Sequence, residues 1–253
     1  MLLKALCLCL TCASYVAATL PPASSKTTSP KKDLIKKEGF FFHGYALKLF
    51  TIIAPATAIL QTIAYVLFMI SDKSFNQLQH LKTWHVLATL AALAGCALRR
   101  WSFATLDRFF TYQLTIRSGH KLVQTGPYRY LRHPSYTGAV INSAATFLLL
   151  WYQGLWGIAS FYILRIASLA AFHLRLAEAP LINTALDLLL DPFVATGSPF
   201  GIDPRIGVVV SFAVSTGALL YRIKNEEAML KEHFGAEWDV YASKRWRLIP
   251  FVY

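Results

Sequence analysis

Polar and aromatic side chains that could hold a charged ligand are concentrated between His120 and Tyr136, a stretch that reads HKLVQTGPYRYLRHPSY. Gly126-Pro127 and His133-Pro134 interrupt helical structure there, because the residue before a proline is pushed toward extended geometry. Backbone groups in such a loop are left available to bind a ligand. A single histidine or interfacial tyrosine usually has only a structural role, but two imidazoles and three tyrosines in one short loop favour a binding site.

A second polar cluster follows the last apolar segment of the chain, where Arg222, Glu226 and Glu227 stand close together. On a helix, Arg222 and Glu226 share one face because they are four residues apart. The simplest interpretation is a solvated ion pair worth a few tenths of a kcal/mol. Their position at a membrane boundary favours a function, since a charge is costly there unless it meets a charged partner. Arg222 suits an anionic group, and the paired glutamates suit a cation.

Several other chemistries are excluded by the motifs that the chain lacks. It contains no HExxH sequence, no pair of CxxC motifs and no cluster with the spacing of metal ligands, so we expect no metal. The GxSxG elbow of serine hydrolases, the GxGxxG fingerprint and the P-loop are absent too. Any cofactor must therefore be held by a helix bundle and its loops.

The composition indicates a membrane protein. Apolar residues make up 55% of the 253 residues and charged residues only 15%, with a mean hydropathy of +0.44, whereas a soluble domain has about 25% charged residues. The 25 Lys and Arg exceed the 13 Asp and Glu and give a net charge of +12. Nucleic-acid binding is the weaker explanation of this charge, because the basic residues adjoin apolar segments and no nucleic-acid motif accompanies them.

Four apolar segments approach the roughly 20 residues that a membrane crossing requires. They predict an all-α, polytopic bundle and are Leu49–Ser71, Thr83–Leu98, Thr137–Leu164 and Ile206–Tyr221. Residues 1–20 resemble either a secretory signal or a retained helix. The lysines at 26–38 favour a retained helix, because the positive-inside rule places this basic linker in the cytosol.

Two further basic stretches should lie on the cytosolic side, at residues 99–133 and 222–247. An even number of crossings between them would join both polar clusters into one cytosolic surface. A cofactor site built from the inter-helix loop and the C-terminal segment is therefore expected on that surface.

The residues of both clusters resemble those of the protein-S-isoprenylcysteine O-methyltransferases, integral endoplasmic-reticulum enzymes that use S-adenosylmethionine. An Arg-His-Pro-x-Tyr-x-Gly block alone would be moderate evidence, and its combination with paired glutamates and a following Phe-Gly is specific. The matching residues are His120-x-Leu122-Val123-x-x-Gly126-x-Tyr128, Arg132-His133-Pro134-Ser135-Tyr136-x-Gly138, Arg222, Glu226-Glu227, His233-Phe234-Gly235, Tyr241 and Ile249-Pro250-Phe251.

The resemblance implies a role for individual residues. Arg222 would bind the substrate and would act in catalysis together with Glu226. No metal is implied. The implied cofactor-binding residues are Gln113, His120, Lys121, Leu122, Val123, Tyr128, His133, Pro134, Ser135, Tyr136 and Glu226.

The resemblance covers roughly residues 99–253, which we expect to form the methyltransferase core, whereas residues 1–98 match only as membrane helices. One departure is an insert of about fifty residues near 154–204, where family members usually have a short hairpin turn. We expect this insert to add helices or an interfacial segment, which leaves the number of crossings open.

The implied reaction is methylation of the C-terminal α-carboxylate of a prenylated cysteine in CaaX-processed proteins, in the endoplasmic-reticulum membrane and on its cytosolic face. Prenylated protein C-termini and membrane lipid are the expected partners. Phosphatidylethanolamine N-methylation is the nearest alternative, with Glu227 or His120 as the base that an ammonium group requires. A sterol-reductase-like oxidoreductase, suggested by the C-terminal RWRLIPFVY sequence, and a non-catalytic paralogue with a blocked lipid groove are less favoured.

Overall fold

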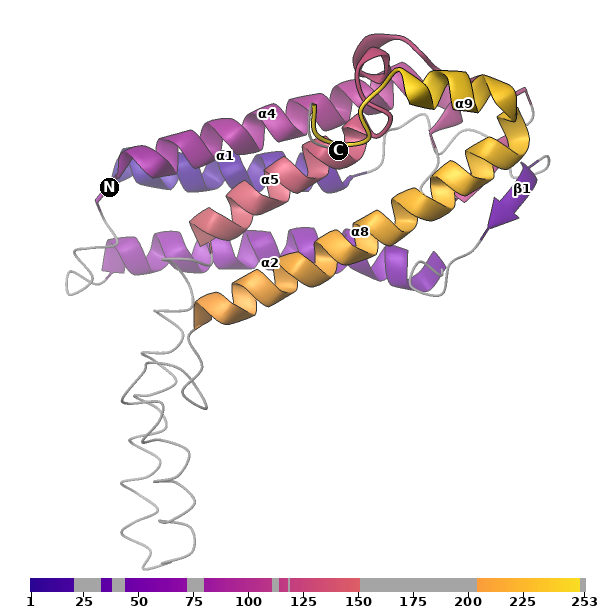
Figure 1. Cartoon of the computed structure of the whole chain (residues 1–253). Helices are drawn as coiled ribbons and strands as arrows, with labels where there is room; N and C mark the ends of the chain where they lie inside the picture. Colours follow the sequence, from indigo (N-terminus) through magenta and orange to yellow (C-terminus); the bar gives the residue numbers. More distant parts are fainter. Residues whose placement is uncertain are drawn as a thin grey trace, which may run out of the picture.

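The computed structural model describes residues 1–20, 33–37, 44–71, 80–110, 114–117, 119–150 and 204–250. Its architecture is mainly helical, as the apolar segments predict (Figure 1). The elements are α1 (Leu2–Thr19), β1 (Asp33–Lys37), α2 (Gly44–Ser71), α4 (Thr83–Leu106), η4 (Asp107–Phe109), β2 (Leu114–Arg117), η5 (Gly126–Arg129), α5 (Pro134–Leu150), α8 (Pro204–Phe234) and α9 (Ala236–Ser243).

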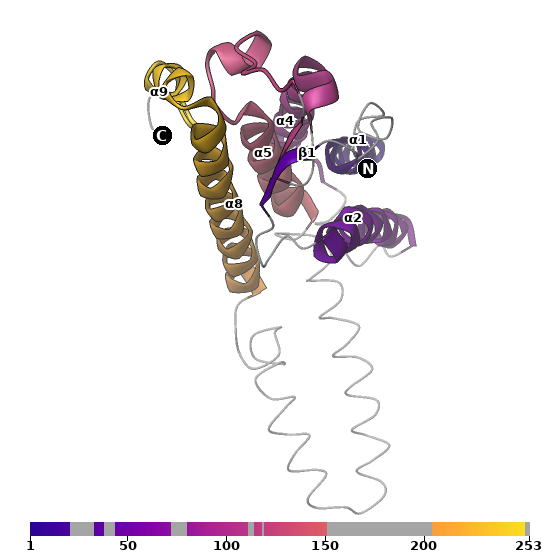
Figure 2. The same ribbon diagram turned by 90° about the vertical axis from the view of Figure 1, so that its right-hand side faces the viewer.

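The helices α1, α4 and α5 run side by side and form the core of the described chain (Figures 1 and 2). Apolar side chains such as Leu8 of α1 and Leu149 of α5 are fully buried between them. Asn142 of α5 is also buried, and its side-chain amide donates hydrogen bonds to Ser14 Oγ of α1 at 2.9 Å and to the Ala92 carbonyl of α4 at 2.8 Å. Buried polar groups need such partners, so this amide ties the three helices into one unit.

The crossing of α4 and α5 depends on two glycines, Gly95 and Gly138. A Cβ atom on Gly138 would lie 2.5 Å from the Gly95 carbonyl oxygen and 2.8 Å from the Arg99 amide nitrogen. Small residues allow membrane helices to approach this closely, since there is no side chain between the backbones. Gly138 of the loop motif therefore sets the position of the first turns of α5, where the polar loop ends.

Helix α8 lies on the side of α5 away from α1, whereas α2 packs mainly against α1 (Figure 2). Pro55 is inside α2, as predicted for a proline that a membrane helix tolerates. Helix α8 continues without a break from Pro204 through the apolar segment to Phe234, so Arg222 and Glu226 share one helix.

The helices predominate, as predicted, and a short two-stranded antiparallel sheet accompanies them. The strands β1 and β2 pair with Ile35 opposite Ile116 and Lys37 opposite Leu114. Strands this short have no distinctive periodicity, so their pairing was not predictable from sequence. The pairing brings residues 33–37 of the predicted basic linker to the end of the molecule that carries the polar loop (Figure 1).

Among the described residues, two helices are long and apolar enough to cross a membrane, Leu2–Thr19 and Thr83–Phe109. The segment Thr51–Leu67 within α2 is a shorter apolar helix. The predicted crossing Thr137–Leu164 corresponds to α5 up to Leu150, and its remainder lies outside the described residues, as does the predicted insert near 154–204.

Candidate active site

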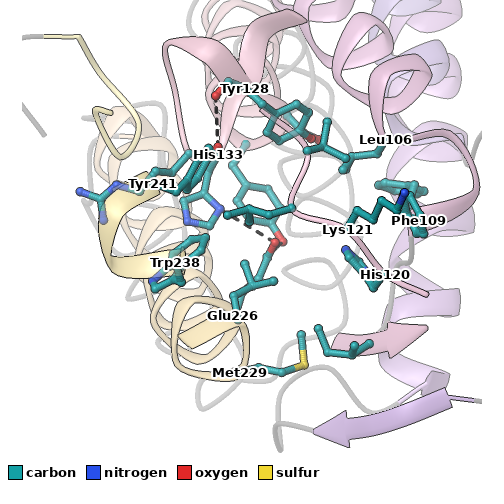
Figure 3. A pocket seen from close by; sticks show the side chains of 18 of the residues that line it. Leu106, Phe109, His120, Lys121, Tyr128, His133, Glu226, Met229, Trp238 and Tyr241 are labelled. Atoms are coloured by element: carbon teal, nitrogen blue, oxygen red, sulfur yellow. Dashed lines mark hydrogen bonds and ion pairs between the residues drawn. The ribbon is translucent and has the colours of Figure 1, made fainter. Parts of the chain in front are cut away.

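A pocket opens at the end of the bundle where the polar loop, the second half of α8 and α9 meet (Figure 3). Glu226 and Met229 of α8 with Trp238 and Tyr241 of α9 form one wall, opposite His120 and its neighbours. The lining residues are Leu106, Phe109, Phe110, Ile116, His120, Lys121, Leu122, Val123, Tyr128, Arg132, His133, Ser135, Tyr136, Arg222, Glu226, Met229, Leu230, Trp238 and Tyr241.

The phenol of Tyr136 links the two charged residues of α8 within this pocket. Its oxygen accepts a hydrogen bond from Arg222 Nε at 2.8 Å and donates one to Glu226 Oε2 at 2.6 Å. Burial first, and then the negative charge of Glu226, raise the pKa of the Tyr136 phenol well above its ordinary value. The phenol therefore keeps its proton and can donate a hydrogen bond to the carboxylate at physiological pH.

Glu227, the second glutamate, has a different environment from Glu226. Its carboxylate accepts a hydrogen bond from Arg132 Nη1 at 3.1 Å, lies 3.1 Å from His133 Nε2 and is paired with Arg247 Nη2. Burial by itself would raise the pKa of Glu227, but the hydrogen bonds and charges of His133 and Arg247 outweigh burial and lower the pKa to about 2. Glu226 lines the pocket and Glu227 does not, so the two adjacent glutamates have different surroundings.

The chain after α9 forms a strap, residues 244–250, that runs along the polar loop. The Arg132 amide donates to the Trp246 carbonyl at 2.8 Å, and the His133 amide donates to the Arg247 carbonyl at 3.1 Å. Thr137 Oγ1 at the start of α5 donates to the Leu248 carbonyl at 2.7 Å. The bonds from the Arg132 and His133 amides satisfy backbone groups that the break at Pro134 would otherwise leave unpaired.

Helix α9 folds back over the pocket because the chain turns sharply at Gly235. This residue has φ +53°, a left-handed conformation that favours glycine. The turn places Trp238 and Tyr241 in the pocket wall, three residues apart on one face of α9. The Tyr241 hydroxyl then donates to the Tyr128 carbonyl at 3.2 Å, which fixes α9 to the loop.

Opposite α9, the imidazole of His120 stacks on the ring of Phe109 and meets the ring of Phe234 edge-on. Its ring centre is 4.8 Å from that of Phe109 and 5.8 Å from that of Phe234. The motif residue Phe234 thus belongs to the packing of His120. Aromatic faces on both sides of the pocket are suited to a cationic or heteroaromatic ligand.

The structure brings almost all of the predicted site residues into this one pocket. His120, Lys121, Leu122, Val123, Tyr128, His133, Ser135, Tyr136, Arg222 and Glu226 line it. Pro134 is buried and begins α5 beside the pocket, and Gln113 lies outside the described residues.

Sequence reasoning did not single out Phe109, Phe110, Trp238 and Met229, which also line the pocket. The spacing of Trp238 and Tyr241 is the one signal that could have indicated a pocket-facing helix. Within the described ranges, no group of three or more His, Cys, Asp and Glu side chains is placed to hold a metal ion.

The fold and the pocket define a class of protein: a bundle of apolar helices with a polar, aromatic-lined ligand site at one end, built from an inter-helix loop and the C-terminal segment. Comparisons with known proteins find matches to one family. The sequence model of the isoprenylcysteine carboxyl methyltransferase family matches residues 86–182. This match includes most of α4, the polar loop and α5, and it extends into the segment predicted to be an insert.

Similar curated proteins carry the corresponding names. A "probable protein-S-isoprenylcysteine O-methyltransferase" of Oryza sativa subsp. indica is 25% identical over 211 residues, which cover 78% of this chain and 81% of the rice protein. "Protein-S-isoprenylcysteine O-methyltransferase B" of Arabidopsis thaliana is 42% identical over 60 residues, which cover 23% of this chain and 30% of the plant protein. No solved structure matches significantly. These matches confirm the resemblance that the motifs predict: part of the chain is similar to the isoprenylcysteine carboxyl methyltransferase family.

Proposed function

We propose that this protein is a protein-S-isoprenylcysteine O-methyltransferase, which transfers the methyl group of S-adenosylmethionine to the C-terminal α-carboxylate of a prenylated cysteine and forms a methyl ester. The observation that carries the proposal is the chain of contacts Arg222–Tyr136–Glu226 inside one pocket. It places a group suited to an anion beside a group suited to a cation, as a reaction between a carboxylate and a sulfonium requires.

The residues around Glu226 fit S-adenosylmethionine. The Glu226 carboxylate and the rings of Tyr128, Trp238 and Tyr241 surround the same space, and a cation is favoured both by a carboxylate and by aromatic faces. When bound, the cofactor supplies an electrophilic methyl group. The binding residues that we propose are the predicted set together with Trp238 and Tyr241.

Arg222 would bind the substrate carboxylate. Its side chain is only 7% exposed in the pocket wall, and a guanidinium in a partly desolvated site is a strong donor to a carboxylate. An α-carboxyl group has an ordinary pKa of about 3.5 and is already ionised at pH 7. The pocket therefore needs no general base, and its residues act by orienting the oxygen and by excluding water.

The same pocket is less suited to methylation of phosphatidylethanolamine. An ammonium with a lysine-like pKa of about 10 must lose a proton before it can attack. Glu227, one of the two bases considered for this step, has its pKa lowered to about 2 and lies outside the pocket lining. A carboxylate with so low a pKa is a poor proton acceptor, which argues against Glu227 as that base.

In the proposed membrane orientation, the pocket lies at the cytosolic boundary of the endoplasmic-reticulum membrane. The water-soluble cofactor would enter from the cytosol, and the prenyl chain would remain in lipid, where its burial contributes about 0.8 kcal/mol per CH₂. Residues 33–37 of the basic linker lie at the same end of the helices as the polar loop through the pairing of β1 and β2, which supports this orientation.

The proposal is tested by supplying methyl-labelled S-adenosylmethionine to membranes that contain the protein. We expect label on a farnesylated cysteine analogue in a base-labile ester, and none with membranes that lack the protein. Label on phosphatidylethanolamine and none on the cysteine analogue would contradict the proposal.

A further inference from the structure

Helix α1 ends next to the pocket, and an arginine of α4 connects the two. The Nε atom of Arg99 donates a hydrogen bond of 2.6 Å to the Ala18 carbonyl in the last turn of α1. The Nη1 atom of the same guanidinium donates to the Ser135 carbonyl at 3.1 Å and to Ser135 Oγ at 3.2 Å. Ser135 lines the pocket. One side chain thus joins the end of α1 to the pocket wall.

This bridge is consistent with the electrostatics of helix ends. The last carbonyl groups of a helix have no partner within the helix and carry partial negative charge, so a nearby cation is stabilising. Helix α1 has no basic residue in its own last turn. Arg99 supplies that charge from α4.

The position of Arg99 follows from the close crossing of α4 and α5. Gly138 lacks the Cβ atom that would lie 3.1 Å from Arg99 Cβ and 2.8 Å from its amide nitrogen. The guanidinium also stacks on Phe103, at 4.8 Å from the ring centre. The stem of Arg99 is therefore held by both helices, and its planar head has a defined orientation from which it can donate in two directions.

We propose that Arg99 is a positioning residue for the cofactor side of the pocket, and that it uses the C-terminal end of α1 as its anchor. In this arrangement α1 is a permanent structural element, although its sequence resembles a removable signal. Removing α1 would leave Arg99 Nε without the Ala18 carbonyl and the buried Asn142 amide without Ser14. The Arg99 guanidinium, which donates to Ser135 in the pocket wall, would then lose its fixed orientation.

The first test compares Arg99→Gln with Arg100→Gln, a matched control in which the neighbouring, exposed arginine is changed. In hydrogen exchange without ligand, we expect the amides of Tyr136 and Thr137, both bonded to the His133 carbonyl, to exchange faster in Arg99→Gln only. Equal exchange in the wild type and in Arg99→Gln would overturn the proposal. Where Arg99→Gln does not fold, Arg99→Lys is measured instead, with an intermediate effect expected because an ammonium lacks the two-directional fork.

The second test measures cofactor binding and rests on the proposed function. We expect Arg99→Gln to raise the Kd of S-adenosylhomocysteine by about tenfold, with Arg99→Lys in between and kcat at saturating methyl donor nearly unchanged. A wild-type Kd in Arg99→Gln would contradict the positioning role. No binding by the wild type would instead remove the proposed function, and the hydrogen-exchange comparison would still decide the role of Arg99.

The third test concerns α1 itself. The intact mass of the purified, active protein should include residues 2–19. An active protein from which this segment has been cleaved would overturn the anchoring role of α1.

Discussion

Tyr136 and Glu226 are joined by a hydrogen bond of 2.6 Å between the phenol and the carboxylate. Because the same phenol oxygen accepts from Arg222, it connects the residue proposed to hold the substrate with the residue proposed to hold the cofactor. Neither of these α8 side chains is positioned by α8 alone, since both depend on a tyrosine from the first turn of α5.

Replacing Tyr136 by Phe should weaken the binding of both the cofactor and the substrate. Hydrogen bonds to charged groups contribute about 1.5–3 kcal/mol each, so we expect the Kd of S-adenosylhomocysteine and the KM of farnesylcysteine both to rise by roughly 10- to 100-fold. Calorimetry and initial rates measure the two effects. Tyr130→Phe is the control, because its side chain is 56% exposed. An effect on only one ligand would show that the phenol does not connect the two subsites.

Arg222→Ala should weaken substrate binding much more than cofactor binding. The KM of the prenylcysteine substrate should rise by 10-fold or more through loss of a charge-assisted bond, while the Kd of the cofactor product changes much less. Lys224→Ala is the matched control, since Lys224 is an exposed cation two residues further along α8. An unchanged response to substrate would remove the proposed role of Arg222.

Glu226→Gln should weaken cofactor binding and leave the folded structure intact. The change keeps the shape of the side chain but removes the negative charge, which we propose to face the sulfonium. We expect the affinity for the cationic S-adenosylmethionine to fall more than that for the neutral thioether S-adenosylhomocysteine, as measured by competition binding. Equal losses for the two ligands would argue against a direct charge interaction.

Glu227 should stabilise the protein in a pH-dependent way. Its pKa is lowered from an ordinary 4.5 to about 2, so its contribution to folding is present above pH 4.5 and is lost as the pH falls toward 2. Thermal unfolding in detergent should show Glu227→Gln to be less stable by several degrees at pH 7, with the difference shrinking between pH 4.5 and 3. A difference that stays constant over this range would mean that the charge of Glu227 does not hold the loop and the strap.

Gly138→Ala should destabilise the crossing of α4 and α5. The added Cβ atom would lie 2.5 Å from the Gly95 carbonyl oxygen, and such overpacking costs about 1–3 kcal/mol. Gly217→Ala is the control within α8, where nothing lies within 4 Å of the new atom, and alanine there should be neutral or slightly stabilising. Equal unfolding temperatures of the two variants would contradict the role of this glycine contact.

Much of the helical framework could be predicted from the sequence. The apolar segments at Leu49–Ser71 and Thr83–Leu98 correspond to α2 and α4, because a long uncharged stretch has few alternatives to a helix in lipid. The polar loop was predicted as a ligand site from its prolines, imidazoles and tyrosines. The strands β1 and β2 and the aromatic wall from α9 were not predicted, because they depend on contacts between segments distant in the sequence.

The different surroundings of Glu226 and Glu227 could not be predicted from the sequence. Adjacent and identical in type, Glu226 and Glu227 point in different directions because side chains of neighbouring residues on a helix are separated by about 100°. Only the folded chain shows that Glu226 faces the pocket, whereas Glu227 meets Arg132, His133 and Arg247.

The sequence by itself determined that this protein is built from apolar helices, which residues could bind a charged ligand and which family it resembles, because composition and motif spacing are properties of the chain alone. The tertiary structure decided how these residues cooperate: Tyr136 between Arg222 and Glu226, the strap against the polar loop, and Arg99 between α1 and Ser135. Each of these relations joins segments far apart in the sequence. Hydrogen bonds of this kind depend on distances and angles that exist only after the helices have packed.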